Sequence, residues 1–180
     1  MRFSISTRLM FLTAICGLAA PAASSAAGNQ YATISGASCK PTSSASNSSF
    51  VTKSVGARNE STTSGVFVVC PFMLSPVPSN GGVITDMNIT LYSIDGVSRT
   101  MSCTAVIGSL NRYVPATYSP KTVSVPTQPA GIVMTWNAAD FGGTAGAGIP
   151  GSAWTTVTCL LPPQTAIGLI YATNNPNLGQ

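Results

Sequence analysis

The chain has 180 residues, a formal net charge of +4, only 7% charged residues and no histidine. The lack of histidine excludes Ser-His-Asp and Cys-His catalysis and removes the commonest metal ligand, so we expect no metal and no cofactor. The few basic residues form no cluster, so we also expect no nucleic-acid partner and no attraction to an anionic membrane.

The amino-terminal segment is typical of a secretory signal peptide. Arg2 and Arg8 precede an uncharged, mainly apolar stretch at residues 9–20, and small residues follow it. This stretch is shorter than the roughly 20 residues of a membrane-spanning helix. We predict cleavage after residues 25–27, with a cut after residues 20–22 as the alternative.

Cleavage at the first position gives a signal peptide at residues 1–27 and a single β-sandwich domain at residues 28–180. The mature domain is then expected to be secreted or periplasmic, with no membrane insertion after the signal is removed. Losing Arg2 and Arg8 leaves six of the eight basic residues against four acidic ones, a net charge of +2.

Cleavage also removes Cys16 and leaves four cysteines in an exported chain, which predicts two disulfides. These residues are Cys39, Cys70, Cys103 and Cys159. A zinc site is the alternative, but it favours closely spaced pairs and these four are scattered. More than one pairing is possible, and we favour Cys39–Cys70 with Cys103–Cys159.

Short β-branched runs alternate with clusters of Gly, Pro, Asn and Ser, which predicts an all-β fold, an antiparallel β-sandwich resembling a jelly roll. The expected strands are Tyr31–Ser35, Val66–Cys70, Val83–Ile94, Val97–Ile107, Thr122–Val125, Ile132–Trp136, Trp154–Leu161 and Ala166–Ala172. The polar connection at residues 41–65 carries at most one poor strand near Phe50, and the tail from Asn174 is expected to fray.

The two strands around Asp95-Gly96 suggest a hairpin whose loop length can be predicted. A two-residue loop would place Ile89 opposite a serine. A three-residue loop places Ile89 opposite Cys103 and joins the two apolar rows, because side chains alternate with period two. We therefore predict a three-residue loop or a bulge, with Gly96 at positive φ and Cys103 pointing inward.

Aromatic residues are the candidates for a sugar-binding platform, since aromatic rings stack on the apolar faces of sugars. The alternative is that Trp136 and Trp154 pack in the core, which we favour. Tyr113 and Tyr118, with Arg112, fall in an expected loop at residues 111–120 and are the better candidates for ligand binding. Tyr92 and Tyr171 complete the aromatic set.

The carboxylates offer an alternative chemistry, because two of them facing each other across a cleft could hydrolyse a glycosidic bond. In the mature chain they are Glu60, Asp86, Asp95 and Asp140. Each also has an ordinary structural interpretation, such as a turn at Asp95.

Two short motifs carry less weight. The glycine-rich segment at residues 146–151 matches a dinucleotide-binding pattern by letter but lacks the following helix, so a flexible loop is expected. Asn47, Asn59 and Asn88 stand in glycosylation sequons and are expected to stay unmodified.

Several segments resemble a family of small, secreted, uncharacterised proteobacterial proteins. The matching pieces are Cys39-Lys40-Pro41, Val68-Val69-Cys70-Pro71, Ser102-Cys103-Thr104, Trp154 leading to Cys159-Leu160-Leu161-Pro162, and the strand at Ile167–Tyr171. The resemblance spans most of the mature chain and implies an all-β fold with two disulfides, without implying an activity.

The function expected from these observations is that of a non-catalytic, secreted β-sandwich module that binds a glycan, a surface or a protein partner. A carboxylate-dependent hydrolase and a structural subunit of a surface polymer are the alternatives. The sequence does not identify the ligand or the partner.

Overall fold

The computed structural model describes residues 28–43, 49–72, 83–108, 115–127, 130–150, 155–176 and 178. Within these ranges the regular structure consists of strands and two short 3-10 helices, η1 (Gly36–Ser38) and η3 (Ala138–Phe141). No helix in this part of the chain has the length and apolar character needed to cross a membrane. The predicted signal peptide lies outside the described residues.

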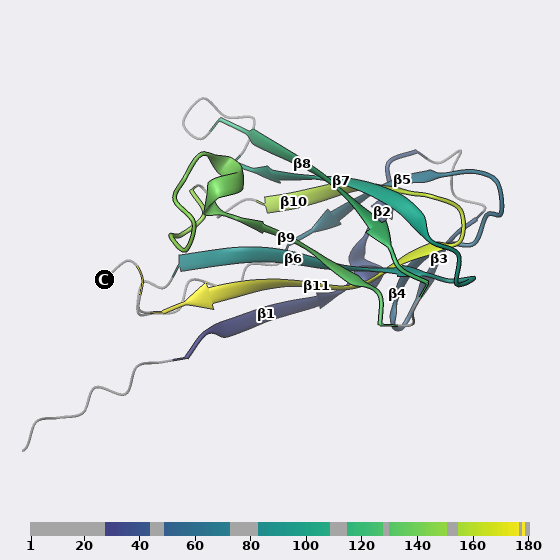
Figure 1. Ribbon diagram of the computed structural model, residues 1–180, viewed down its shortest axis with the longest axis horizontal. Coiled ribbons are helices and arrows are strands. Elements are labelled where there is room, and N and C mark those ends of the chain that lie inside the picture. The colour runs from purple at the N-terminus through teal and green to yellow at the C-terminus, as the bar shows by residue number, and fades with distance from the viewer. Residues whose placement is uncertain are drawn as a thin grey trace, which may run out of the picture.

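The strands form two antiparallel sheets that stack face to face (Figure 1). The first sheet has the order β3 (Phe50–Lys53), β4 (Gly56–Asn59), β11 (Thr165–Asn175), β6 (Val83–Ser93), β9 (Ile132–Asn137), and β1 (Gln30–Ser35) pairs with β11 beside β4. The second has the order β2 (Lys40–Pro41), β5 (Val66–Pro71), β10 (Thr155–Leu161), β7 (Arg99–Ile107), β8 (Thr117–Val125).

The chain crosses repeatedly between the sheets, and this connectivity makes the sandwich a jelly roll. From β4 onward the strands fall into the orders β4-β11-β6-β9 and β5-β10-β7-β8, so that every neighbouring pair is antiparallel. That arrangement is two interleaved Greek keys. The predicted fold class is therefore confirmed.

The core lies between the sheets and is built by inward-facing residues, which alternate with more exposed residues along β5, β7 and β10. In β10 every second residue is buried, and in β6 the side chains of Met87, Ile89 and Leu91 are fully buried. Trp136 of β9 is also fully buried, and its indole Nε1 donates to the Ser119 carbonyl of β8 at 2.9 Å. This is the core position that we favoured for the tryptophan, while Trp154 lies outside the described residues.

The predicted hairpin between β6 and β7 is wrong, because these two strands belong to different sheets. Ile89 is opposite Met134 of β9, whereas Cys103 is opposite Cys159 of β10. The two apolar rows do meet in the core, but across the sandwich and not within one sheet. Gly96 has a φ of 72°, as predicted, because the connection still turns sharply there.

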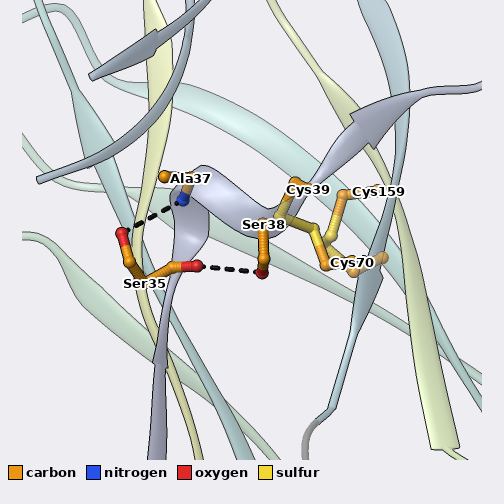
Figure 2. Close-up of a disulfide and its surroundings, with 7 residues drawn as sticks. Ser35, Ala37, Ser38, Cys39, Cys70 and Cys159 are labelled. Atoms are coloured by element: carbon orange, nitrogen blue, oxygen red, sulfur yellow. Dashed lines mark hydrogen bonds between the residues drawn. A yellow bond between two sulfur atoms is a disulfide. The ribbon is translucent and has the colours of Figure 1, made fainter. Parts of the chain in front are cut away.

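Both disulfides have the predicted pairing and join neighbouring strands of the second sheet. Cys103 and Cys159 are directly opposite each other on β7 and β10, with their Cα atoms 4.1 Å apart. Cys39 precedes β2 and pairs with Cys70 of β5, again with 4.1 Å between the Cα atoms. Figure 2 shows Cys159 beside the Cys39–Cys70 disulfide. Such disulfides persist in oxidising compartments outside the cytosol.

The segment that carries Tyr118 is a strand, which corrects the expectation of a loop. β8 runs through Pro120 and pairs with β7 from Thr117 to Val125. Proline is tolerated here because β8 is the edge strand of its sheet and its outer side needs no N–H donor.

Candidate functional site

A groove of about 530 Å³ lies on the outer face of the first sheet, the face that points away from the core. Its floor comes from β6 and β11, including Tyr92 and residues 166–169, and its wall comes from Val55 and Arg58 of the β3–β4 hairpin. The volume falls in the range of sites that hold small ligands. The groove is built mainly on paired strands, so its geometry is set by the sheet register.

One cross-strand row defines the groove. Arg58 of β4 and Tyr92 of β6 are both opposite Ala166 of β11. Two strand spacings of about 4.8 Å therefore separate the Cα atoms of Arg58 and Tyr92 by about 10 Å. Ala166, between the longer Arg58 and Tyr92, has a small side chain, and all three residues line the groove.

The ring of Tyr92 lies between one glycine on β11 and another just before β9. A β-carbon added at Gly168 would lie 2.5 Å from Tyr92 Cε2, and one added at Gly131, just before β9, would lie 2.6 Å from Tyr92 Cδ1. Real side chains do not approach that closely. The two edges of the ring therefore contact the backbone on either side of β6, and Tyr92 is one of the residues that line the groove.

A β-bulge in β11 shapes the groove beside this ring. The register with β6 shifts between Ile167 and Ile170, so Gly168 and Leu169 fall outside the regular ladder. On the other side of β11, the neighbour changes at the same place from β1 to β4. Gly56 at the start of β4 approaches the Ile167 carbonyl so closely that a β-carbon would lie 2.1 Å from it. The bulge thus brings the β3–β4 hairpin against the groove.

Arg58 is a cation without a partner among the described residues, since it makes no ion pair and no side-chain hydrogen bond there. Of the other basic side chains that the structure describes, all except Lys40 are paired with a carboxylate. Lys53 Nζ is 3.8 Å from Glu60 Oε1, and both side chains are exposed.

The most defined ion pair is a turn contact and not part of the groove. Arg99 Nη1 and Nη2 donate to Asp95 Oδ1 and Oδ2 at 2.5 and 2.6 Å. Hydrogen bonding to the Arg99 guanidinium holds the pKa of the Asp95 carboxyl well below its usual range, and the same contact raises the pKa of Arg99. The backbone N–H of Val97 also donates to Asp95 Oδ1 at 3.1 Å, so Asp95 is the turn residue that the sequence suggests.

Further aromatic and apolar side chains continue along the same outer face. The rings of Tyr31 on β1 and Tyr171 on β11 pack edge to face, with centroids 6.3 Å apart. Tyr31 is 65% exposed, and Leu169 and Val133 are each 44% exposed. Tyr171 is opposite Asn88 of β6. Asn88 is four residues from Tyr92, so these two positions are about 13 Å apart along the strand.

The structure separates the predicted aromatic set. Tyr92 and Tyr171 share the outer face of the first sheet, whereas Tyr118 is opposite Val106 on β7, and both face outward from the second sheet. Tyr118 is 60% exposed and lies on the opposite side of the sandwich. Arg112 and Tyr113 lie outside the described residues.

The carboxylates do not gather in the groove, whose lining includes none of those that the structure describes. Asp86 lies near the start of β6 and Asp95 lies in the turn after its end at Ser93, so about 23 Å of strand lies between Asp86 and that turn. Asp140 Oδ2 accepts from Lys121 Nζ and from the Asn137 backbone N–H, both at 2.8 Å, and so caps η3. Among the described residues no three His, Cys, Asp or Glu side chains could hold a metal ion together.

The sequons are partly buried in the fold. Asn59 is fully buried, and its Nδ2 donates to the carbonyls of Ser64, Leu161 and Pro162 at 2.8, 3.0 and 3.0 Å. Asn88 is also buried, and Asn47 lies outside the described residues. A glycan could not be attached to Asn59 in the folded chain.

The glycine-rich segment is better ordered than a flexible loop. The backbone N–H of Ile149 donates to the Ile84 carbonyl of β6 at 2.7 Å, and the Ile149 side chain is buried. Gly151 lies outside the described residues.

No family model and no curated protein sequence matches this chain. Among solved structures, a chain from the crystal structure of tomato aspermy virus is similar at 10% identity and a TM-score of 0.39, covering 83% of this chain and 78% of that one. A family 11 carbohydrate-binding module from Clostridium thermocellum, solved with a β-1,3-1,4-mixed-linked tetrasaccharide, is similar at 11% identity and a TM-score of 0.36, covering 83% and 91%. The family 11 module of a cellulosomal cellulase of Clostridium thermocellum gives 11% identity and a TM-score of 0.34 over 83% and 88%.

Proposed function

We propose that the mature protein is a non-catalytic module that binds a glycan in the groove over Tyr92. The observation that carries this proposal is the position of the Tyr92 ring, which lies between Gly131 and Gly168 and lines the groove. The face of a sugar ring presents C–H groups, which pack favourably on the electron-rich face of an aromatic ring.

Polar groups beside the ring support the same proposal. Tyr92 and Thr90 line the groove, and their hydroxyls make no hydrogen bond with the described residues. They are therefore available to the hydroxyls of a sugar. Tyr31, Tyr171 and Leu169 extend the same face beyond the groove, which suits an extended oligosaccharide more than a compact small molecule.

The groove favours binding over hydrolysis. Glycoside hydrolysis uses two carboxyl groups that flank the scissile bond, and no described carboxylate lines this groove. The hydroxyl-bearing and aromatic residues that line the groove can bind a sugar, but none of the described lining residues is an acid that could protonate a leaving oxygen.

The test is affinity gel electrophoresis of the mature protein through a panel of soluble polysaccharides, followed by calorimetry with oligosaccharides of any that retard it. We expect Tyr92→Ala to weaken binding about five- to thirtyfold, since one stacked ring contributes about 1–2 kcal/mol. Ala166→Leu fills the space beside the ring and should weaken binding without removing an aromatic or charged group.

Tyr118→Ala is the control, because it removes a tyrosine, more exposed than Tyr92, from the outer face of the opposite sheet. Its affinity should equal that of the wild type. The proposal fails if no polysaccharide retards the protein, or if Tyr92→Ala and Tyr118→Ala bind equally well.

A further inference from the structure

We infer that the groove selects glycans that carry an anionic group, a uronate carboxylate or a sulfate ester, and that Arg58 binds this group. The inference rests on the proposed function, because it assigns the ligand class of the same groove. It is carried by one juxtaposition, an unpaired guanidinium placed beside an aromatic floor across a single small residue, Ala166.

The charge of Arg58 is not neutralised by the protein. Lys53, Arg99 and Lys121 each lie within 4 Å of a carboxylate, whereas Arg58 has no such contact in the described structure. Glu60, two residues further along the chain, contacts Lys53 at 3.8 Å. Lys53 and Arg58 on the β3–β4 hairpin, with Glu60 directly after β4, have a net charge of +1.

The lining of the groove adds no negative charge. The charged side chain among its described residues is Arg58, and the others are apolar, hydroxyl-bearing or glycine. An anionic ligand would therefore meet a cation and no opposing carboxylate, while a cationic ligand would meet only repulsion. The low overall charge of the chain means that few other cations compete for the same ligand.

The chemistry of arginine suits such a ligand. A guanidinium is planar, always charged, and donates two parallel hydrogen bonds to a carboxylate or a sulfate. The Cα atoms of Arg58 and Tyr92 are about 10 Å apart across Ala166. A sugar resting over Ala166 could stack on Tyr92 and direct its acidic group toward Arg58 at the same time.

The test compares three sets of soluble polysaccharides with the wild-type protein: polygalacturonate and alginate for carboxylates, carrageenan for sulfate esters, and neutral glucans and xylans. We expect at least one anionic set to bind about tenfold more tightly than the neutral set at low salt, and the advantage to shrink as sodium chloride screens the charge. The two anionic sets distinguish the carboxylate from the sulfate source.

Arg58→Gln should reduce the preference for the anionic set to about twofold or less, and Arg58→Lys should restore part of it. Lys40→Gln is the matched control, because Lys40 is another cation without an ion pair but belongs to the second sheet. Glu60→Gln should strengthen anionic binding. Thermal unfolding of Arg58→Gln should be close to that of the wild type, since no ion pair or hydrogen bond is lost.

The outcomes separate this inference from the proposed function. If neutral glycans bind through Tyr92 as tightly as anionic ones, or if Arg58→Gln keeps the anionic preference, the inference is overturned and the proposed function stands. If polysaccharides of all three sets fail to bind, the proposed function fails and the inference fails with it.

Discussion

Replacing Asn59 by alanine is expected to destabilise the fold more than any ordinary polar substitution. The buried amide donates to the carbonyls of Ser64, Leu161 and Pro162, and its Oδ1 accepts from the Ser61 N–H at 3.1 Å. It therefore holds the end of β4 and the turn before β11 together. Truncation leaves these groups unpaired, at about 1–3 kcal/mol for each group that water cannot reach.

The contact with Leu161 is fully buried and the others are partly buried, so we estimate a total loss of about 3–4 kcal/mol. That is a large share of the stability of a typical domain and corresponds to about 10 °C in Tm. Urea unfolding of Asn59→Ala, followed through the fluorescence of the buried Trp136, measures the loss directly.

Asn88→Ala is the control, because Asn88 is also a buried asparagine but accepts one hydrogen bond, from Thr135 Oγ1 at 2.7 Å. We expect it to cost about 1 kcal/mol. If Asn59→Ala costs no more than Asn88→Ala, the role given to the Asn59 amide is wrong.

Three further predictions concern the groove, the disulfides and the acid response. Gly168→Ala should displace the Tyr92 ring and weaken glycan binding in calorimetry. Unchanged binding would show that Gly168 does not position the ring. Replacing Cys103 and Cys159 together by alanine opens a loop of 56 residues and should lower the free energy of unfolding by about 4 kcal/mol in urea titrations. The pKa of Asp95 is lower in the folded chain than its value of about 4 in the unfolded chain, so ionised Asp95 stabilises the fold above about pH 4. This stabilisation is lost as the pH falls through the folded pKa. Asp95→Asn should therefore make the free energy of unfolding depend less on pH in the acid range. An unchanged pH dependence would contradict that pairing.

The strand pattern and the disulfides were predictable because each depends on local or compositional signals. Both β5 and β10 are rich in β-branched or apolar residues, part of β10 alternates in residue type, and prolines end β5 and follow β10. The pairing of the cysteines was harder, since it depends on which strands become neighbours, but the favoured pairing is confirmed.

The hairpin prediction failed for a physical reason. Two amphipathic strands joined by a short turn can bury their apolar rows side by side in one sheet, or facing each other across a sandwich. The alternation around Ile89 and Cys103 fits both arrangements. Only the competing partners on β9, β10 and β11 decide between them, and these lie far away in the sequence.

The groove was the least predictable feature. Arg58 belongs to the polar connection that offered one poor strand, and Ala166 and Tyr92 are unremarkable strand residues on their own. Their alignment depends on β4, β6 and β11, which are brought together only by the jelly-roll crossings. The signal that could have pointed to it was the glycine pair at 131 and 168, which makes sense only beside a large ring.

The disulfides and the groove lie on different sheets, and we expect a ligand to bind to the strands of the first sheet. The disulfides cross-link neighbouring strands of the second sheet, while the groove lies on the first sheet with neither disulfide in it. The first sheet is held instead by burial of its inner face and by the close approach of Gly56 to the β11 backbone. A groove lined mainly by hydrogen-bonded strands loses little conformational entropy when a ligand binds, because its side chains are already positioned. Any substitution that loosens the Gly56 contact should therefore reduce affinity before it reduces stability.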